Sequence, residues 1–223
     1  MPTLMVADDH PLFREAMVGA IAAALPGSRV LEADSLGRAV SLAAAHDELD
    51  LLLLDLALPD SDGLAGLSRL RVELPWLPVA ILSAEQRRET VLEALDLGAV
   101  GYIPKSTPRT DLLAALRQLL EGQVYLPADI LRRPPLRDDI PADDTPRLPD
   151  VRLAELTAKQ REVLNCLSRG ESNKHIAREL DIAETTVKTH VSAILRKLGV
   201  TSRIQAILTA RELTPPHESR SSR

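Results

Sequence analysis

Five polar side chains of the types that handle phosphate follow short apolar runs in the first half of the sequence. They are the adjacent carboxylates of Asp8 and Asp9, a third carboxylate, Asp55, the hydroxyl of Ser83 and the ammonium of Lys105. Adjacent carboxylates repel and need a cation, and oxygen ligands favour a hard ion, Mg²⁺ above all. A carboxylate beside Mg²⁺ can attack phosphorus, while a lysine and a hydroxyl bind the phosphoryl oxygens. Any one of the acids could instead cap a helix or lie in a loop. Five polar residues that follow successive apolar runs nevertheless indicate one site.

The segments that would position these side chains are of two kinds, short apolar runs and longer stretches with helical spacing. Stretches with helical spacing separate the apolar runs, which predicts a doubly wound, five-stranded parallel α/β sheet. Ser35 is a candidate N-cap of the second helix, and the fourth and fifth helices should end at Gly98 and Gly122. The expected strands are 4–7, 29–33, 51–54, 79–82 and 101–103. The all-leucine run 51–54 suits a central strand buried on both faces. Ligands of such sheets bind outside the carboxyl ends of the strands, where the five polar side chains lie.

Length and charge divide the chain into two parts. Its 223 residues suit two small globular domains, and no apolar run is long enough to cross a bilayer. We expect a first domain at 1–125, a proline- and aspartate-rich linker at 126–152, a second domain at 153–214 and a tail at 215–223. Residues 1–125 carry a net charge of −8 and residues 153–223 one of +4, which favours nucleic-acid binding by the C-terminal part alone. The single cysteine, Cys166, is expected to be a buried apolar residue.

The C-terminal part predicts four short helices with a helix-turn-helix in the middle. Thr157 and Gln160 form a capping box for the first helix, and Ser172 is a candidate cap of the second. The third helix should run from about Thr185 to Leu198, and a second capping box at 202–205 should open the fourth. On the third helix an apolar stripe should face the core, formed by Val187, Val191, Ile194 and Leu198. The outward face carries Lys188, Thr189, Ser192 and Arg196, a basic and hydroxyl-bearing surface that suits a major groove. The alternative is that its cations merely solvate an exposed face.

The ordered motifs of residues 1–125 resemble the receiver domain of two-component response regulators, which has a flavodoxin-like fold. The segments that carry the resemblance are Val6–His10, Leu54–Gly63, Leu82–Ala84 and Gly101–Lys105. The resemblance implies that Asp55 accepts phosphate from a sensor histidine kinase. It also implies Mg²⁺ ligation by Asp9, Asp55 and the carbonyl of Ala57, with Asp8 acting through a water. Ser83 and Lys105 would bind the phosphoryl group.

Two positions of this resemblance leave alternatives open. Tyr102 stands where such domains keep a rotating aromatic switch that senses Ser83, although it could simply be a strand residue packed under the fourth helix. Receivers often place a cis proline directly after the lysine. Here Pro104 precedes Lys105 and Ser106 follows it, which leaves the role of the lysine intact but the loop geometry open.

The C-terminal helices resemble the LuxR-type helix-turn-helix, and the combination resembles the NarL/FixJ type of response regulator. The motifs lie at 156–164, 170–177, 185–191 and 194–198. The resemblance makes the third helix the recognition helix, with Lys188, Thr189 and Ser192 at base edges. Phosphate contacts are assigned to Lys174, Thr186, His190, Arg196 and Lys197, although His190 could equally be packed. The last helix supplies the dimer contact in relatives, here Val200, Ile204 and Ile207, although Ile204 and Ile207 could equally be core residues.

The sequence therefore predicts a phosphorylation-switched transcription regulator with Mg²⁺ as cofactor. Its expected partners are a sensor histidine kinase, double-stranded promoter DNA, RNA polymerase and, when phosphorylated, a second copy of itself. It is expected in the cytoplasm, away from membranes, and not to be an enzyme beyond its own phosphoryl transfer and dephosphorylation. One alternative is an aspartyl-phosphate phosphatase, but such enzymes keep an acid where Ala57 stands. Another is a DNA-binding regulator that does not respond to phosphate.

Overall fold

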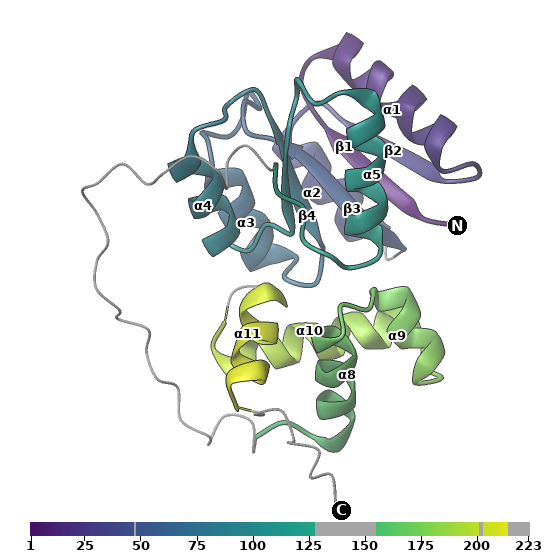
Figure 1. The fold of residues 1–223 in the computed structure, drawn as a ribbon, viewed down its shortest axis with the longest axis vertical. Coiled ribbons are helices and arrows are strands. Elements are labelled where there is room, and N and C mark those ends of the chain that lie inside the picture. Colours follow the sequence, from purple (N-terminus) through teal and green to yellow (C-terminus); the bar gives the residue numbers. More distant parts are fainter. Residues whose placement is uncertain (47, 128–154, 201–202, 214–223) are drawn as a thin grey trace, which may run out of the picture.

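A computed structural model describes residues 1–46, 48–127, 155–200 and 203–213 of the chain. The expected linker and tail lie almost wholly outside these residues. The N-terminal domain is one parallel sheet of order β2-β1-β3-β4-β5, flanked by helices (Figure 1). Its strands are β1 (Thr3–Ala7), β2 (Arg29–Ala33), β3 (Leu49–Asp55), β4 (Val79–Ser83) and β5 (Gly101–Pro104). Its helices are α1 (Pro11–Ala24), α2 (Leu36–Ala45), α3 (Ala65–Glu73), α4 (Arg88–Asp96) and α5 (Arg109–Leu120). The predicted doubly wound fold is confirmed.

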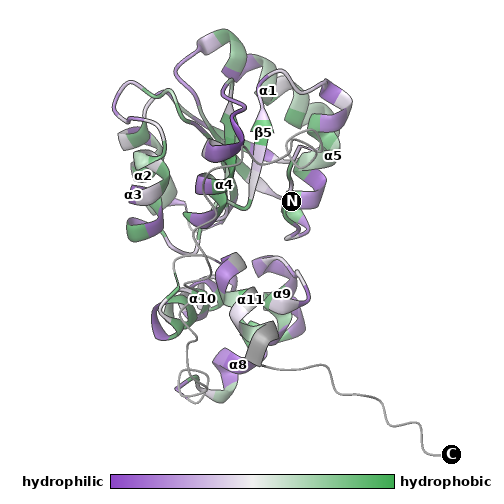
Figure 2. Cartoon of the chain, turned by 60° about the vertical axis from the view of Figure 1, so that its left-hand side comes forward, coloured by the Kyte–Doolittle hydropathy of each residue, from purple (hydrophilic) through white to green (hydrophobic). Residues whose placement is uncertain are grey.

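The sheet is buried on both faces because each face packs against its own layer of helices. Leu52 and Leu54 of β3 belong to the apolar cluster shared with α2, α3 and α4, whereas Leu51 and Leu53 belong to the cluster shared with α1 and α5. All four leucines are at most 1% exposed. Figure 2 shows the same distribution, with hydrophobic colour on the strands and polar residues on the outer faces of the helices. The leucine run is therefore a central strand, as predicted.

The C-terminal domain contains α8 (Ala158–Ser168), α9 (Asn173–Glu179), α10 (Glu184–Leu198) and α11 (Arg203–Leu213). The capping box of Thr157 and Gln160 is present, and the hydroxyl of Ser172 accepts a hydrogen bond from the N–H of His175. The predicted apolar stripe of α10 lies in a separate hydrophobic cluster, in which Cys166 is also buried. The second predicted capping box begins at Ser202, outside the described residues.

The prediction that Ser35 caps α2 is only half right. Ser35 occupies the N-cap position, but its side chain makes no capping hydrogen bond and donates instead to Asp34 at 3.2 Å. The carboxylate of Asp60 takes that role, accepting from the backbone N–H of Leu36 at 2.7 Å and of Gly37 at 2.8 Å. Asp60 lies in the loop after β3, so this contact ties the loop that follows Asp55 to the start of α2.

Replacing Asp60 by alanine should lower the free energy of unfolding by about 1 kcal/mol at neutral pH, the usual cost of losing a helix cap. The hydrogen bonds from Gly37 and Leu36 lower the pKa of the Asp60 carboxyl below its ordinary value of 3.8. The stabilisation is therefore complete above that value and disappears as the pH falls through the lowered pKa. Chemical denaturation at pH 7 and at a series of pH values below 3.8 should show a difference between the two proteins that is full at pH 7 and shrinks as the pH falls. Asp62→Ala, at an exposed position in the same loop, is the control and should cost less at pH 7.

The two domains meet at the edge of the sheet where the parallel strands begin. Residues near the strand starts, among them Pro2, Asp50 and Pro78, line a shared cavity with residues of the C-terminal domain. Lys174 of α9 donates to the carbonyl of Met1 at 3.2 Å, and Gln205 of α11 donates to the carbonyl of Asp96 at 3.1 Å. Figures 1 and 2 show α10 and α11 beside this end of the N-terminal domain. The predicted phosphate site lies at the opposite edge, where the strands end.

Candidate functional site

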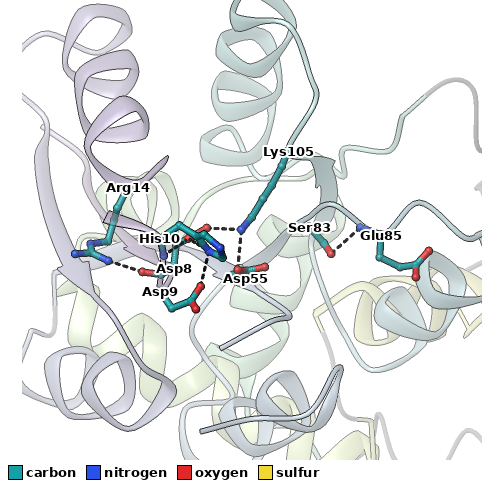
Figure 3. A network of polar contacts seen from close by, with 8 residues as sticks. All are labelled: Asp8, Asp9, His10, Arg14, Asp55, Ser83, Glu85 and Lys105. Carbon is teal, nitrogen blue, oxygen red and sulfur yellow. Dashed lines mark hydrogen bonds and ion pairs between the residues drawn. The ribbon is translucent and has the colours of Figure 1, made fainter. Parts of the chain in front are cut away.

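The three predicted carboxylates converge at the carboxyl edge of the sheet (Figure 3). Asp8 follows β1 and Asp55 ends β3, and the neighbouring positions of these two strands bring their side chains together. Asp8 is 0% and Asp55 3% exposed, whereas Asp9 is half-buried. Ligand atoms of these three carboxylates and of His10 lie within 4.8 Å of one another.

Lys105 supplies positive charge between the two buried acids. Its Nζ lies 2.7 Å from a carboxylate oxygen of Asp8 and 2.7 Å from one of Asp55. Burial alone would lower the pKa of Lys105, but the hydrogen bonds to Asp55 and Asp8 outweigh it and raise the pKa. The backbone N–H of Lys105 donates to the carbonyl of Ser83 at 2.8 Å, which holds the loop after Pro104 against β4. The ammonium thus lies where it can bind an incoming anion beside Asp55.

Two residues that sequence reasoning missed also contact the acidic cluster. Nδ1 of His10 lies 2.6 Å from Asp9, and the backbone N–H of His10 donates to Asp8 at 2.8 Å. The guanidinium of Arg14 donates to the carbonyl of Asp8 at 2.6 Å. His10 adjoins the two acids in the sequence, which was a usable signal. For Arg14 the sequence offered no signal beyond its position one helical turn after His10.

Ser83 and Tyr102 are both held to the loop between β4 and α4. The hydroxyl of Ser83 accepts from the N–H of Glu85 at 3.1 Å, and the hydroxyl of Tyr102 donates to the carbonyl of Glu85 at 2.7 Å. The Tyr102 side chain is 0% exposed and packs in the core, and burial raises the pKa of its phenol. In this structure Tyr102 is packed in β5, and its polar tip holds the backbone next to Ser83.

The donor set fits a hard divalent cation. Three carboxylates share one small space, and oxygen ligands of this kind suit Mg²⁺ better than softer metals. Lys105 only partly compensates the negative charge of the cluster. The acidic edge could therefore hold a metal ion beside Asp55.

The candidate DNA-binding surface lies on α10, and there one prediction is wrong. Lys188 was expected to point outward to solvent, but it is only 6% exposed. Its Nζ lies 4.1 Å from the centre of the Trp76 ring, which belongs to the N-terminal domain. Lys188 is not exposed in the way that its place on the helix predicted, because the N-terminal domain covers it. Trp76 is the only tryptophan of the chain, yet nothing in its sequence neighbourhood indicated this contact.

The other predicted DNA contacts are more accessible. Thr189 and Arg196 are exposed, and the half-buried residues are Lys174, Thr186, His190, Ser192 and Lys197. Lys197 is engaged within its own domain, donating to the carbonyl of Glu155 at 2.9 Å and to the side chain of Gln160 at 2.8 Å. The dimer candidates Val200 and Ile207 are half-buried and pack against the core, while the side chain of Ile204 lies outside the described residues. Val200 was predicted on the last helix, but it lies before α11, which begins at Arg203. The predicted DNA-binding face of α10 is thus only partly covered by the N-terminal domain.

Comparison with known families bears on the alternative functions left open by the sequence. Residues 4–117 match the response regulator receiver domain, and residues 154–210 match the bacterial regulatory proteins of the luxR family. The chain belongs to the response regulators with a LuxR-type DNA-binding domain. As a member of this family it is a phosphorylation-controlled transcription regulator, which argues against the phosphatase alternative. In the described residues no helix is long and apolar enough to span a membrane.

Relatives of this response regulator match along nearly their whole length. The glycerol metabolism activator of Pseudomonas putida is 51% identical over 96% of both chains. The nitrate/nitrite response regulator protein NarL of Escherichia coli K12 is 36% identical over 92% of both. A LuxR family DNA-binding response regulator from Silicibacter pomeroyi superposes with a TM-score of 0.52 at 34% identity, covering 58% of this chain and 99% of that one.

Proposed function

We propose that Asp55 is the phosphoryl acceptor of this response regulator. A carboxylate oxygen of Asp55 would attack the phosphorus of a phosphohistidine on a sensor kinase. The new O–P bond makes an acyl phosphate, and the electrons of the broken P–N bond return to the imidazole. The observation that carries the proposal is the ammonium of Lys105, 2.7 Å from both Asp8 and Asp55, at the open edge of the sheet. It can bind the phosphoryl oxygens as the phosphoryl group, with its negative charge, moves onto Asp55.

We further propose that Asp8, Asp9, Asp55 and the carbonyl of Ala57 form the Mg²⁺ site, with Asp8 acting through water. When bound, Mg²⁺ would neutralise charge on the phosphoryl oxygens. Ser83 would bind the transferred group, and Tyr102 would respond by moving the loop that its hydroxyl now holds at Glu85.

Asp9→Ala should weaken Mg²⁺ binding by roughly tenfold or more, because the half-buried Asp9 supplies one of the three clustered carboxylates. A Mg²⁺ titration followed by the melting temperature, without a phosphodonor, measures this directly. Glu48→Ala removes a carboxylate that pairs with Arg29 away from the site and should leave the titration unchanged. If the Asp9→Ala titration matches that of the wild type, Asp9 is not a ligand.

DNA recognition is proposed for α10, with Lys188, Thr189 and Ser192 at base edges and Arg196 and Thr186 at phosphates. Lys174, His190 and Lys197 stay predicted phosphate contacts. Val200, Ile204 and Ile207 stay predicted dimer contacts of the phosphorylated form. The name of the Pseudomonas putida relative supports activation of transcription. A contact with RNA polymerase, a cytoplasmic location, self-catalysed dephosphorylation and domain limits at 125 and 153 also remain predictions.

The contact between the domains supports an autoinhibited form before phosphorylation. Trp76 covers Lys188, so the lysine cannot meet a base while the domains are docked. The net charges of −8 and +4 on residues 1–125 and 153–223 favour this contact. Phosphorylation would shift the equilibrium toward separated domains, provided that the phosphorylated receiver binds the other domain less tightly.

Two glycines at the domain contact provide a matched test of this form. Gly122 and Gly170 both have φ of +85°, so alanine strains either backbone alike. A Cβ on Gly122 would overlap the carbonyl of Gly170 in the other domain, whereas a Cβ on Gly170 meets nothing within 4 Å. Gly122→Ala should therefore raise the affinity of the unphosphorylated chain for its DNA by about fivefold or more, the usual lower range of such coupling. Gly170→Ala should not, and equal affinities of the two variants would argue against autoinhibition.

A further inference from the structure

A cavity of about 150 Å³ lies between the two domains, apart from the phosphate site and the exposed face of α10. The N-terminal domain contributes apolar walls, among them Leu49, Val100 and Leu119, and the C-terminal domain contributes polar and cationic side chains. Because both domains line it, the cavity exists only while they are docked. A molecule bound there would contact the two domains at once.

The lining of this cavity is unbalanced toward positive charge. Three cationic side chains, Lys174, Lys188 and Arg203, line it, and Asp50 is the one carboxylate among its described lining residues. Asp50 already accepts a hydrogen bond from the backbone N–H of Thr3 at 2.9 Å. The cavity therefore suits an anion better than a neutral or cationic molecule.

Arg203 is the group most in need of such an anion. Its guanidinium donates to the carbonyl of Glu171 and to the side-chain oxygen of Asn173, both of which are neutral acceptors. Its Nε is buried and has no hydrogen-bond partner among the described residues. Burial lowers the pKa of Arg203 to about 10. The Glu171 carboxylate attracts Arg203 from nearby but does not hydrogen-bond to it. A guanidinium whose Nε is buried and whose hydrogen bonds go only to neutral acceptors is costly, and a carboxylate is the group whose geometry best matches it.

We propose that the cavity between the domains binds a small monocarboxylate, whose carboxylate pairs with Arg203 and whose apolar part lies against Leu49, Val100 and Leu119. An apolar cavity of about this volume accommodates a benzene ring, which sets the size of the apolar part. A space of about 150 Å³ is too small for a nucleotide. The ligand stabilises the docked form and so opposes DNA binding, an effect that rests on the proposed autoinhibition.

This makes the ligand and DNA competitors, and Lys174 and Lys188, which line the cavity, are also among the proposed DNA contacts. A molecule that binds only the docked form multiplies the ratio of docked to undocked protein by one plus its concentration divided by its dissociation constant. By linkage, DNA that requires separated domains lowers the affinity for the carboxylate by the same factor. The protein would then respond to a metabolite as well as to its kinase.

Benzoate is the probe that tests the proposal on the unphosphorylated full-length protein. Calorimetric titration should give a dissociation constant in the millimolar range or tighter, as expected for so small a ligand. Benzyl alcohol, the neutral analogue, should bind at least tenfold more weakly because it lacks the charge that pairs with Arg203. Benzoate should also weaken DNA binding, measured against equimolar chloride because salt alone weakens it. Equal binding of benzoate and benzyl alcohol, or no binding of either, overturns the proposal.

Variants locate the site and separate this proposal from the function it rests on. Arg203→Gln should abolish benzoate binding, whereas Arg178→Gln, at an exposed position of the same domain, should retain it. Melting temperatures show whether Arg203→Gln folds, and Val100→Phe, which fills the cavity without removing charge, should abolish binding as well. Benzoate binding that survives in both folded variants overturns the proposal. If benzoate fails while phosphorylation still strengthens DNA binding, only the ligand site is lost and the response-regulator mechanism stands.

Discussion

Asp55→Ala is expected to reduce labelling of the protein by an acyl phosphate donor with Mg²⁺ to background. Among the acids of the described strand β3, only Asp55 lies at the carboxyl edge beside Asp8, and Lys105 contacts both of them. Asp8 is held by Lys105, by the N–H of His10 and by its place at the end of β1, so it has little freedom to replace Asp55 as nucleophile. The measurement is phosphorylated protein separated from unphosphorylated protein by phosphate-affinity electrophoresis.

The matched control for this experiment is Asp62→Ala. It removes an exposed carboxylate from the loop that follows Asp55 and should leave labelling within about twofold of the wild type. Asp55→Asn keeps the shape of the side chain and should also abolish labelling, because an amide is not a nucleophile at phosphorus. Full labelling of either Asp55 variant would assign the acceptor to another residue.

Lys188→Ala should weaken binding of the phosphorylated protein to its specific DNA by about 5- to 150-fold, the range of 1–3 kcal/mol typical of a base contact. If Lys188 meets only a phosphate, binding should fall by a similar factor on every sequence, with a shallower dependence on salt. Titrations of specific and scrambled duplexes at two salt concentrations separate these cases. Unchanged binding to both duplexes would remove Lys188 from the interface.

Trp76→Ala is the complementary variant because it removes the cover and keeps the lysine. In the unphosphorylated protein it should strengthen specific DNA binding, since Lys188 loses a contact that holds the domains together. In the phosphorylated protein, where the domains are expected to be apart, it should change little. A variant that binds DNA no better before phosphorylation would show that the contact with Trp76 does not restrain α10.

The sequence predicted those parts of the molecule whose cause is local. The leucine run of β3, the apolar stripe of α10 and the cap at Thr157 each follow from periodicity or from neighbours within a few residues. The three acids and Lys105 could be grouped because parallel strands end at one edge. Residue type, order and spacing carried these inferences.

Features that depend on contacts between residues far apart in the sequence could not be predicted from the sequence. The cap of α2 comes from Asp60, 24 residues after the N–H of Leu36 that it binds, so Ser35 looked sufficient. Lys188 lies on the expected face of α10, but its burial depends on Trp76 in another domain. No periodicity within α10 could report a surface that docks on it from outside. Domain contacts of this kind need the three-dimensional arrangement.

Docking at the amino edge of the sheet affects how quickly the protein can respond to its kinase. Asp55 and Lys105 lie at the other edge, so the docked domain does not obstruct the kinase's approach to them. In the proposed autoinhibited form, the docked protein would itself be the substrate. Phosphate transfer would then not be slowed by having to wait for the undocked fraction. Tightening the domain contact by mutation should therefore suppress basal transcription without lengthening the lag between signal and phosphorylation.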